Sequence, residues 1–472
     1  MNHSTAAANT RPTDRGFFGH PKGLAYLSFT EAWERFSFYG MQALLMLYLV
    51  QHLLHPDVAA GVFGLGPLRA ALERLTGPLS EQAFASQIFG WYSGLVYFTP
   101  VFGGLLADRV LGQRRTVLLG AALMVAGHLL MALEAAFLPA LVLLVAGSGC
   151  LKGNISVQVG QLYGAHEEGR RSRAFAIFSA AINVGALFGP LVCAVVAQVW
   201  GWHMGFAVAG VMMLVAMGIY IAGRRYLPPD VLRQREALPR APLTAHDWRV
   251  IVALVLVSLL AVLPAAAYNQ EMIAGMLFIE ASVDRSFLGW MLPTSGFNAL
   301  DGLFCIVFVP PLVALWRRQA QRGREPGELG KIAIGYLITA LASVAMVWPA
   351  ARAEAGQTVG VVWPVLLFAL NALGFLYYWP TLLALFSRAA PAAVNSTLMG
   401  VLFFSTFLGN VASGFFGGGW ETMGHAHFFW LHAALSLGPF VLTLLTLRPL
   451  ERLFASSAPC APAAPMPRPP SG

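Results

Sequence analysis

Four charged residues occur in segments of the sequence that are otherwise apolar. Glu31, Glu34 and Arg35 stand in the stretch EAWERF, and Lys152 stands among small residues in GSGCLKGNISVQVGQLY. On a helix, Glu31 and Arg35 share one face with the glutamate N-terminal, while Glu34 lies on a neighbouring sector. Two carboxylates balance two cations when both acids are ionised, and protonating one acid releases a cation. The pattern indicates a proton-coupled switch, although a structural ion pair around Arg35 and a Lys152 that reaches the interface are simpler interpretations.

The composition of the chain is that of an integral membrane protein. Its 472 residues are 57% hydrophobic and 11% charged, and the mean hydropathy is +0.65. A typical soluble domain carries about 25% charged residues. The four cysteines (Cys150, Cys193, Cys305 and Cys460) lie far apart and lack metal-site or redox spacing, so we interpret them as small hydrophobic residues.

Apolar stretches long enough to cross a bilayer recur along the whole chain. A hydrocarbon core of about 30 Å requires roughly 20 apolar residues per helix. Twelve segments meet this requirement: 24–53, 84–107, 115–134, 137–162, 174–199, 203–223, 249–279, 288–316, 328–351, 359–387, 396–418 and 427–447. We therefore predict an all-α integral membrane protein with twelve transmembrane helices.

Basic residues are concentrated in alternate connections between these segments. With the N-terminus in the cytoplasm, about 24 of the 30 Lys and Arg residues fall on the cytoplasmic side, about four fall outside, and Arg35 and Lys152 lie within spans. This asymmetry predicts that both termini are cytoplasmic. The formal net charge of +8 is likewise explained by the basic residues of the cytoplasmic connections, so no nucleic-acid partner is expected.

The charged, proline-bearing segment 224–248 divides the spans into two groups of six and is predicted to be a cytoplasmic linker. We expect six-helix bundles at 23–223 and 249–450, a cytoplasmic tail at 1–22, and a disordered Pro-rich cytoplasmic tail at 451–472. Two six-helix bundles are the major facilitator arrangement, in which the substrate site lies between the bundles near the middle of the membrane.

The second half contains intramembrane acids of its own. Asp301 lies in FNALDGLFCIVF, and Glu271 follows AAAYNQ, where it could line a pathway or sit at the outer rim. Asn183, in FSAAINVGALFGP, is uncharged, and many intramembrane asparagines only join helices. His128 and His203 stand alone in the sequence, so no metal site is expected.

Several motifs resemble those of the proton-dependent oligopeptide transporter family of the major facilitator superfamily. EAWERFSFYG is similar to the family's first-helix E-x-x-E-R-F-x-Y-Y-G, with Phe38 in place of a tyrosine. GGLLADRVLGQRRTVLLG, LKGNISVQVGQLY and FAIFSAAINVGALFGPLV resemble the family's second to fifth helices. VDRSFLGWMLPTSGFNALDGLF and LMGVLFFSTFLGNVASG extend the resemblance into the second half, so it covers roughly residues 22 to 447.

The resemblance implies alternating-access import of di- and tripeptides together with protons. In the family pattern, Glu31, Glu34 and Arg35 couple the proton, and Lys152 is their salt-bridge partner. Arg35 and Lys152 also receive the peptide carboxylate. The remaining residues that we assign to substrate binding are Tyr39, Tyr92, Asn183, Asn269, Gln270, Asp301 and Trp379.

Some positions depart from the family pattern. The seventh-helix glutamate of F-E-Q is replaced by Asn269 in YNQE, and the tenth-helix glutamate of L-G-E-L is replaced by Phe375 in LGFLYYWP. A substrate ammonium group is costly to desolvate without a carboxylate. We therefore hypothesise that Asp301 or Glu271 takes this role. The alternative is a modified peptide, a peptide-like drug or an organic anion as the cargo.

Other classes of function have less support in the sequence. A receptor would require a folded cytoplasmic domain, and a membrane enzyme would require a catalytic motif such as H-E-x-x-H or G-x-S-x-G. We expect no cofactor, with protons as the coupling ion. The expected partners are a small peptide and the lipid bilayer, and the expected state is a monomer.

Overall fold

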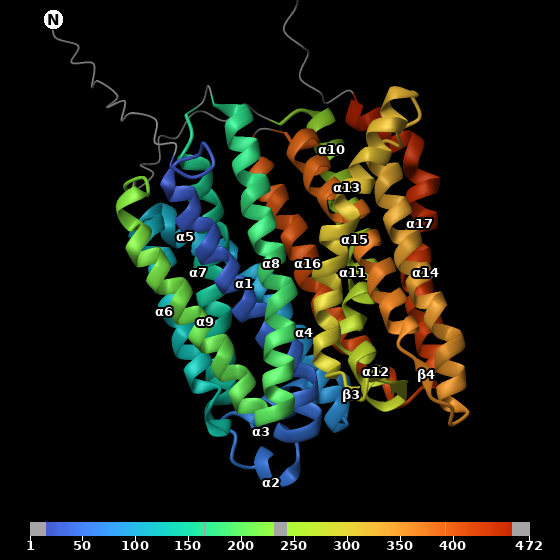
Figure 1. Cartoon of the computed structure of the whole chain (residues 1–472). Helices are drawn as coiled ribbons and strands as arrows, with labels where there is room; N and C mark the ends of the chain where they lie inside the picture. The colour runs from blue at the N-terminus through green and yellow to red at the C-terminus, as the bar shows by residue number, and fades with distance from the viewer. Residues whose placement is uncertain (1–15, 165–166, 231–242, 392, 456–472) are drawn as a thin grey trace, which may run out of the picture.

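The computed structural model describes residues 16–164, 167–230, 243–391 and 393–455. Long helices run side by side through the molecule (Figure 1). They are α1 (Lys22–Tyr48), α4 (Glu81–Phe98) continued by α5 (Pro100–Leu106), α6 (Gln113–Leu130), α7 (Phe137–Gln161), α8 (Glu168–Trp200), α9 (Trp202–Gly223), α10 (Ala245–Leu260) continued by α11 (Val262–Tyr268) and α12 (Ala274–Ser282), α13 (Ala299–Gln321), α14 (Glu328–Glu354), α15 (Val362–Ala389), α16 (Asn395–Gly417) and α17 (His425–Ala455).

Ten helical segments of the described chain are long and apolar enough to span a membrane. The helices α1 and α6 are not among the ten. However, α1 packs against α8 and α9, and α6 packs against α7 and α9, so both belong to the same bundle. With them the described chain contains the twelve crossings that the sequence predicts, and the predicted fold class is confirmed.

Two of the crossings are interrupted. The second crossing breaks at Thr99, where Pro100 opens α5 and the Thr99 hydroxyl donates hydrogen bonds to the carbonyls of Leu95 and Val145. The seventh crossing contains the short 3₁₀ turn Asn269–Met272 between α11 and α12. Such discontinuous helices expose irregular backbone only where it lines a protein interior or a cavity.

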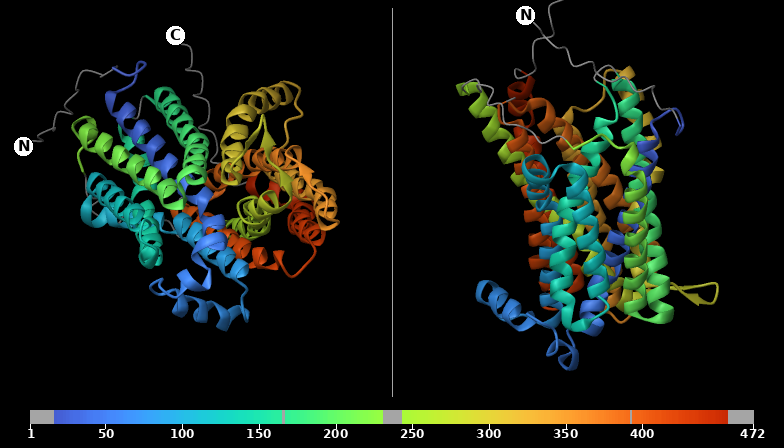
Figure 2. Two further views of the ribbon diagram at one scale, coloured as in Figure 1. Left: turned by 60° about the horizontal axis from the view of Figure 1, so that its bottom comes forward. Right: turned by 90° about the vertical axis from the view of Figure 1, so that its left-hand side faces the viewer.

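The end of the bundle at which α1 begins and α17 ends is called the termini end below (Figure 1). Small elements project from the opposite end, namely α2 (Pro56–Ala59), the amphipathic α3 (Leu65–Thr76) and a hairpin of β2 (Ser286–Phe287) and β3 (Trp290–Met291) (Figure 2). A further strand pair, β1 (Val283–Asp284) and β4 (Val359–Gly360), runs parallel.

Some predicted boundaries were wrong. The span predicted at 288–316 instead begins with a 3₁₀ turn at Thr294, because Gly289, at φ +80°, closes the tight β2–β3 turn just before it. Within the predicted linker, α10 already begins at Ala245, where Thr244 and Asp247 form a capping box. Within the predicted C-terminal tail, α17 extends to Ala455. Residues 1–15, 231–242 and 456–472, which include most of both predicted tails and Cys460, lie outside the described residues. The other three cysteines are buried and unpaired.

Glycines let α4 and α16 approach closely, joining the first six crossings to the last six. A Cβ at Gly90 would lie 2.6 Å from the Asn410 carbonyl oxygen and 2.8 Å from the Gly414 Cα. A Cβ at Gly414 would lie 2.6 Å from the Ser86 carbonyl oxygen. Small residues of this kind allow membrane helices to pack backbone to backbone.

Candidate functional site

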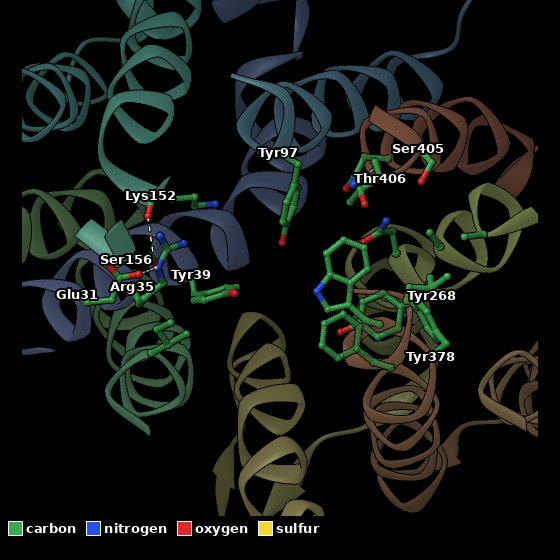
Figure 3. A pocket seen from close by; sticks show the side chains of 18 residues that line it. Glu31, Arg35, Tyr39, Tyr97, Lys152, Ser156, Tyr268, Tyr378, Ser405 and Thr406 are labelled. Atoms are coloured by element: carbon green, nitrogen blue, oxygen red, sulfur yellow. Dashed lines mark hydrogen bonds and ion pairs between the residues drawn. The ribbon is translucent and has the colours of Figure 1, made fainter. Parts of the chain in front are cut away.

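A cavity of about 330 Å³ lies between the first six and the last six crossings (Figure 3). A volume of this size falls within the range of small-molecule sites. The lining side chains come from α1, α4, α7, α8, α11, α15, α16 and the residues that connect them. They are Glu31, Arg35, Tyr39, Tyr97, Lys152, Ser156, Ile182, Ala261, Ala265, Tyr268, Asn269, Phe375, Tyr378, Trp379, Leu382, Ser405, Thr406 and Asn410.

The lining follows the periodicity of the helices. Glu31, Arg35 and Tyr39 are spaced four apart on α1, and Lys152 and Ser156 are spaced four apart on α7. Residues at i and i+4 lie on the same face of a helix. The helices α1 and α7 therefore each turn a polar stripe towards the cavity.

Arg35 lies at the centre of the charged cluster. Its Nε atom lies 2.9 Å from Glu31 Oε1 and 2.8 Å from Glu34 Oε2. The side chains are 6%, 3% and 0% exposed respectively, so Glu34 lies behind Arg35, away from the cavity. Both carboxylates contact the same guanidinium edge. Among the described residues, the two Nη atoms of Arg35 have no hydrogen-bond partner, and they remain able to bind an anion.

Lys152 does not form the ion pair that the resemblance implies. Its ammonium nitrogen lies 4.1 Å from the centre of the Phe38 ring and 4.8 Å from that of Tyr97, and no carboxylate of the described chain lies within 4.0 Å of it. The expected salt bridge is thus absent from this conformation, because Arg35 engages both glutamates. Cation–π contact stabilises the lysine instead.

The opposite wall of the cavity is aromatic and uncharged. Tyr268 stacks on Phe375 with ring centroids 5.5 Å apart, and Phe375 stacks on Trp379 at 6.4 Å. Trp379, which the sequence analysis assigns to substrate binding, also lines the cavity. The side chains of Ser405 and Thr406 add hydroxyl groups beside this wall (Figure 3).

Asp301 lies one hydroxyl group away from the cavity. Its Oδ1 accepts a hydrogen bond of 2.9 Å from the Tyr268 hydroxyl, and Tyr268 lines the cavity. Asp301 itself borders a small void of about 10 Å³ that it shares with Tyr39. Tyr268 therefore connects Asp301 to the cavity through a single hydrogen bond, which Asp301 polarises.

At the break in the seventh crossing, three consecutive residues point in different directions. Asn269, which the sequence analysis assigns to substrate binding, lines the cavity. The Gln270 side chain turns away and donates a 2.7 Å hydrogen bond to the Ser413 carbonyl. Glu271 is 1% exposed and accepts a 3.0 Å hydrogen bond from Asn371. Neither Gln270, which the sequence analysis assigns to substrate binding, nor Glu271 lines the cavity.

Two further predicted binding residues do not line this cavity. Tyr92 is 3% exposed and borders an apolar pocket between α3, α4 and α7. Asn183 is half-buried on α8, and it is the preceding Ile182 that lines the cavity. A shift of one residue along a helix moves a side chain to a different face, so neighbouring residues need not both reach the cavity.

Sequence analysis also missed several residues of the cavity. Tyr97, Ser156, Tyr268 and Tyr378 line it, as does a polar group on α16 formed by Ser405, Thr406 and Asn410. The signal for the last group was present in the sequence, because Thr406 and Asn410 are four apart in an apolar segment.

His203 was expected to stand alone, and this was wrong. Its Nε2 lies 3.9 Å from Glu134 Oε1, and the same oxygen lies 2.6 Å from His52 Nε2. His128 is buried and shares a 2.7 Å hydrogen bond with the Ser37 hydroxyl.

Comparison with known proteins identifies the class of this fold and site. Residues 114–238 and 243–418 match the family model described as POT family, so the chain belongs to the POT family. It is therefore a multi-pass membrane transporter.

The chain is similar to several particular members of this family. It is 31% identical to peptide transporter YePEPT of Yersinia enterocolitica, over 86% of this chain and 89% of that one. It is 28% identical to a di-/tripeptide transporter of Lactococcus lactis, over 94% and 99%. A crystal structure of peptide transporter POT in complex with sulfate aligns at a TM-score of 0.81 with 26% identity, covering 93% of this chain and 97% of that one.

Proposed function

We propose that this chain is a proton-coupled symporter that imports di- and tripeptides by alternating access. The observation that carries the proposal is the cavity of a POT-family chain in which Arg35 holds two buried glutamates through Nε alone. The peptide-transporting relatives favour peptides over the alternative cargoes.

The cluster couples a proton to the substrate. With Glu31 and Glu34 ionised, both acids compete for Arg35. Protonation of one acid removes a negative charge beside Arg35, so the free Nη atoms attract a peptide carboxylate more strongly and can bind it in a bidentate manner. Lys152, on the same wall of the cavity, supplies a second positive charge. Cation–π contacts are weaker than a desolvated ion pair, so Lys152 is able to exchange partners during the cycle.

The peptide ammonium group is placed at the opposite wall. Of the two acids considered from the sequence, we assign this role to Asp301, acting through Tyr268. The Tyr268 hydroxyl donates a hydrogen bond to Asp301, so the lone pairs of the hydroxyl oxygen can accept a hydrogen bond from an ammonium group in the cavity. Glu271 does not line the cavity, and one of its two carboxylate oxygens already accepts a hydrogen bond from Asn371.

We assign this structure to the inward-facing conformation. At the end away from the termini, Gln198 Nε2 donates to the Met291 carbonyl at 3.0 Å and Gln82 Nε2 donates to the Gly417 carbonyl at 3.0 Å. Both bonds join the first six crossings to the last six. We place both termini in the cytoplasm, with the bundles at 23–223 and 249–450 rocking about the cavity in the inner membrane of a bacterial cell. The working unit is a monomer, and protons are the coupling ion.

Uptake into proteoliposomes tests the function directly. The purified chain is reconstituted and given an inward-directed pH step, and labelled di-alanine is followed with and without the step. Accumulation above the external concentration, competed by dipeptides and tripeptides and less well by N-blocked analogues, is the expected result. Equal uptake with and without the pH step would refute proton coupling.

A further inference from the structure

Three metal-ligating side chains meet at the end of the bundle opposite the termini, outside the cavity. They are His52, in the π-helical turn after α1 (Leu49–Leu53), Glu134, in the connection between α6 and α7, and His203, in the first turn of α9. One ligand atom from each lies within 4.8 Å of the other two. We propose that this cluster binds one Zn²⁺ ion from the external medium.

The donor set selects the metal. Ca²⁺ and Mg²⁺ require cages of oxygen ligands, and thiophilic ions prefer cysteine. Two imidazoles and one carboxylate are typical of Zn²⁺ sites with three protein ligands, in which water takes the fourth position. The three side chains are 33%, 38% and 39% exposed, so the cluster lies at the surface of the protein, although the Nε2 atom of His203 itself is shielded from solvent.

The distances are close to those of a bound ion. Zinc ligands lie at about 2.0–2.2 Å from the metal, which places ligand atoms roughly 3.3–3.5 Å apart in a tetrahedral arrangement. The observed separations from Glu134 Oε1 are 2.6 Å to His52 Nε2 and 3.9 Å to His203 Nε2, and they bracket this value. Binding a zinc ion would require each of these two separations to change by about 1 Å or less.

Hydrogen bonding within the described chain does not satisfy the cluster. The carboxylate oxygen of Glu134 pairs with His52, while the Nε2 atom of His203 is shielded from solvent and has no hydrogen-bond partner among the described residues. A buried polar atom without a partner is unfavourable. A metal ion between the three groups would engage His203 as well as His52.

The position of the zinc site within the fold determines how bound zinc should affect stability and transport. All three ligands belong to the first six crossings, and they join the far end of the first crossing, the connection between the third and fourth, and the start of the sixth. Zinc should therefore stabilise this part of the protein against unfolding without locking it to the last six crossings. A site bridging the two groups would instead arrest transport.

Zinc titration of the full-length, chelator-treated protein tests the site. Isothermal titration calorimetry is expected to show one saturable Zn²⁺ per chain. His52→Ala, Glu134→Gln and His203→Ala should each weaken binding by roughly a hundredfold or more, because changes to outer partners alone cost about 10–100-fold. The exposed His55, in the same loop as His52, provides the matched control His55→Ala, which should bind like the wild type.

A second measurement does not depend on the folding of any variant. Zinc X-ray absorption on the wild-type protein should show nitrogen and oxygen ligands at about 2.0–2.2 Å, and zinc should raise the thermal unfolding temperature while uptake persists. An absence of saturable binding, equal affinity in the three ligand variants, an all-oxygen shell, or arrest of uptake by zinc would each overturn the proposal.

Discussion

At the scale of single residues, the charged cluster is explained by the cost of burying charge. A charge at the centre of a bilayer is unfavourable by several kcal/mol, with estimates from about 2.5 upwards. Glu31 and Glu34 offset this cost by sharing Arg35, and Lys152 offsets it over two aromatic rings. The arrangement remains sensitive to a single proton, because one cation serves two acids.

Removing either a buried acid or a buried cation of this cluster should uncouple transport from the proton gradient. We expect Glu34→Gln to abolish accumulation driven by a pH step, since a neutral amide cannot exchange the proton, and Lys152→Ala to do the same by removing the second cation. The measurement is concentrative di-alanine uptake in proteoliposomes. Glu73→Gln in α3, remote from the cavity, is the control and should accumulate normally. Concentrative uptake retained by both the Glu34 and the Lys152 variant would refute the coupling assignment.

The assignment of Asp301 to the substrate ammonium group yields a second prediction. Asp301→Asn and Tyr268→Phe should each raise the KM for di-alanine by roughly tenfold or more, since a hydrogen bond to a charged group contributes about 1.5–3 kcal/mol. Uptake of an N-acetylated dipeptide should change little. Glu271→Gln, which can keep its contact with Asn371, is expected to have the smaller effect on the KM. If Glu271→Gln alone impairs binding of the free amine, the role belongs to Glu271.

At the scale of elements, the sequence predicted the crossings better than the site. The apolar segments fix twelve helices because each must satisfy its backbone within the membrane. Which face of a helix lines the cavity depends on helix register. Of three residues that the sequence assigns to substrate binding, Asn269 and Trp379 line the cavity and Gln270 does not. Contacts between distant segments, such as His52 with Glu134, arise only from tertiary packing and carry no local signal.

The close contact of α4 and α16 should be sensitive to side-chain volume. Gly90→Val would place atoms against the Asn410 carbonyl and Gly414, where a Cβ already comes within 3.0 Å. We expect a loss of stability of about 1–3 kcal/mol and a lower uptake rate, as for other overpacked contacts. Gly218→Val on α9 is the control, because nothing lies within 4 Å of its added Cβ. Thermal unfolding in detergent measures the difference, and equal melting temperatures would contradict the packing argument.

A histidine contact at the termini end makes stability depend on pH. His20 Nδ1 lies 2.8 Å from the Tyr163 hydroxyl, and burial, together with Arg170 and Arg173, lowers the His20 pKa below its usual 6.5. The folded state therefore binds fewer protons than the unfolded state, so the stabilisation is complete above pH 6.5 and is lost as the pH falls through the lowered pKa. His20→Asn should reduce the loss of melting temperature between pH 7 and pH 5. An identical loss in the variant would exclude His20 as its source.

At the scale of the whole molecule, alternating access requires the contacts at the end away from the termini to open. The bond between Gln198 and Met291 joins the first six crossings to the last six, so a covalent link between these positions should hold that end closed. We expect the double variant Gln198→Cys and Met291→Cys, treated with a short bifunctional thiol reagent, to lose uptake, and a reducing agent to restore it. The matched control is Glu328→Cys with Arg388→Cys, a surface pair within the last six crossings whose link should leave uptake unchanged. Transport at the normal rate by the fully crosslinked Gln198 and Met291 variant would mean that this end need not open, and alternating access between the two bundles would have to be abandoned.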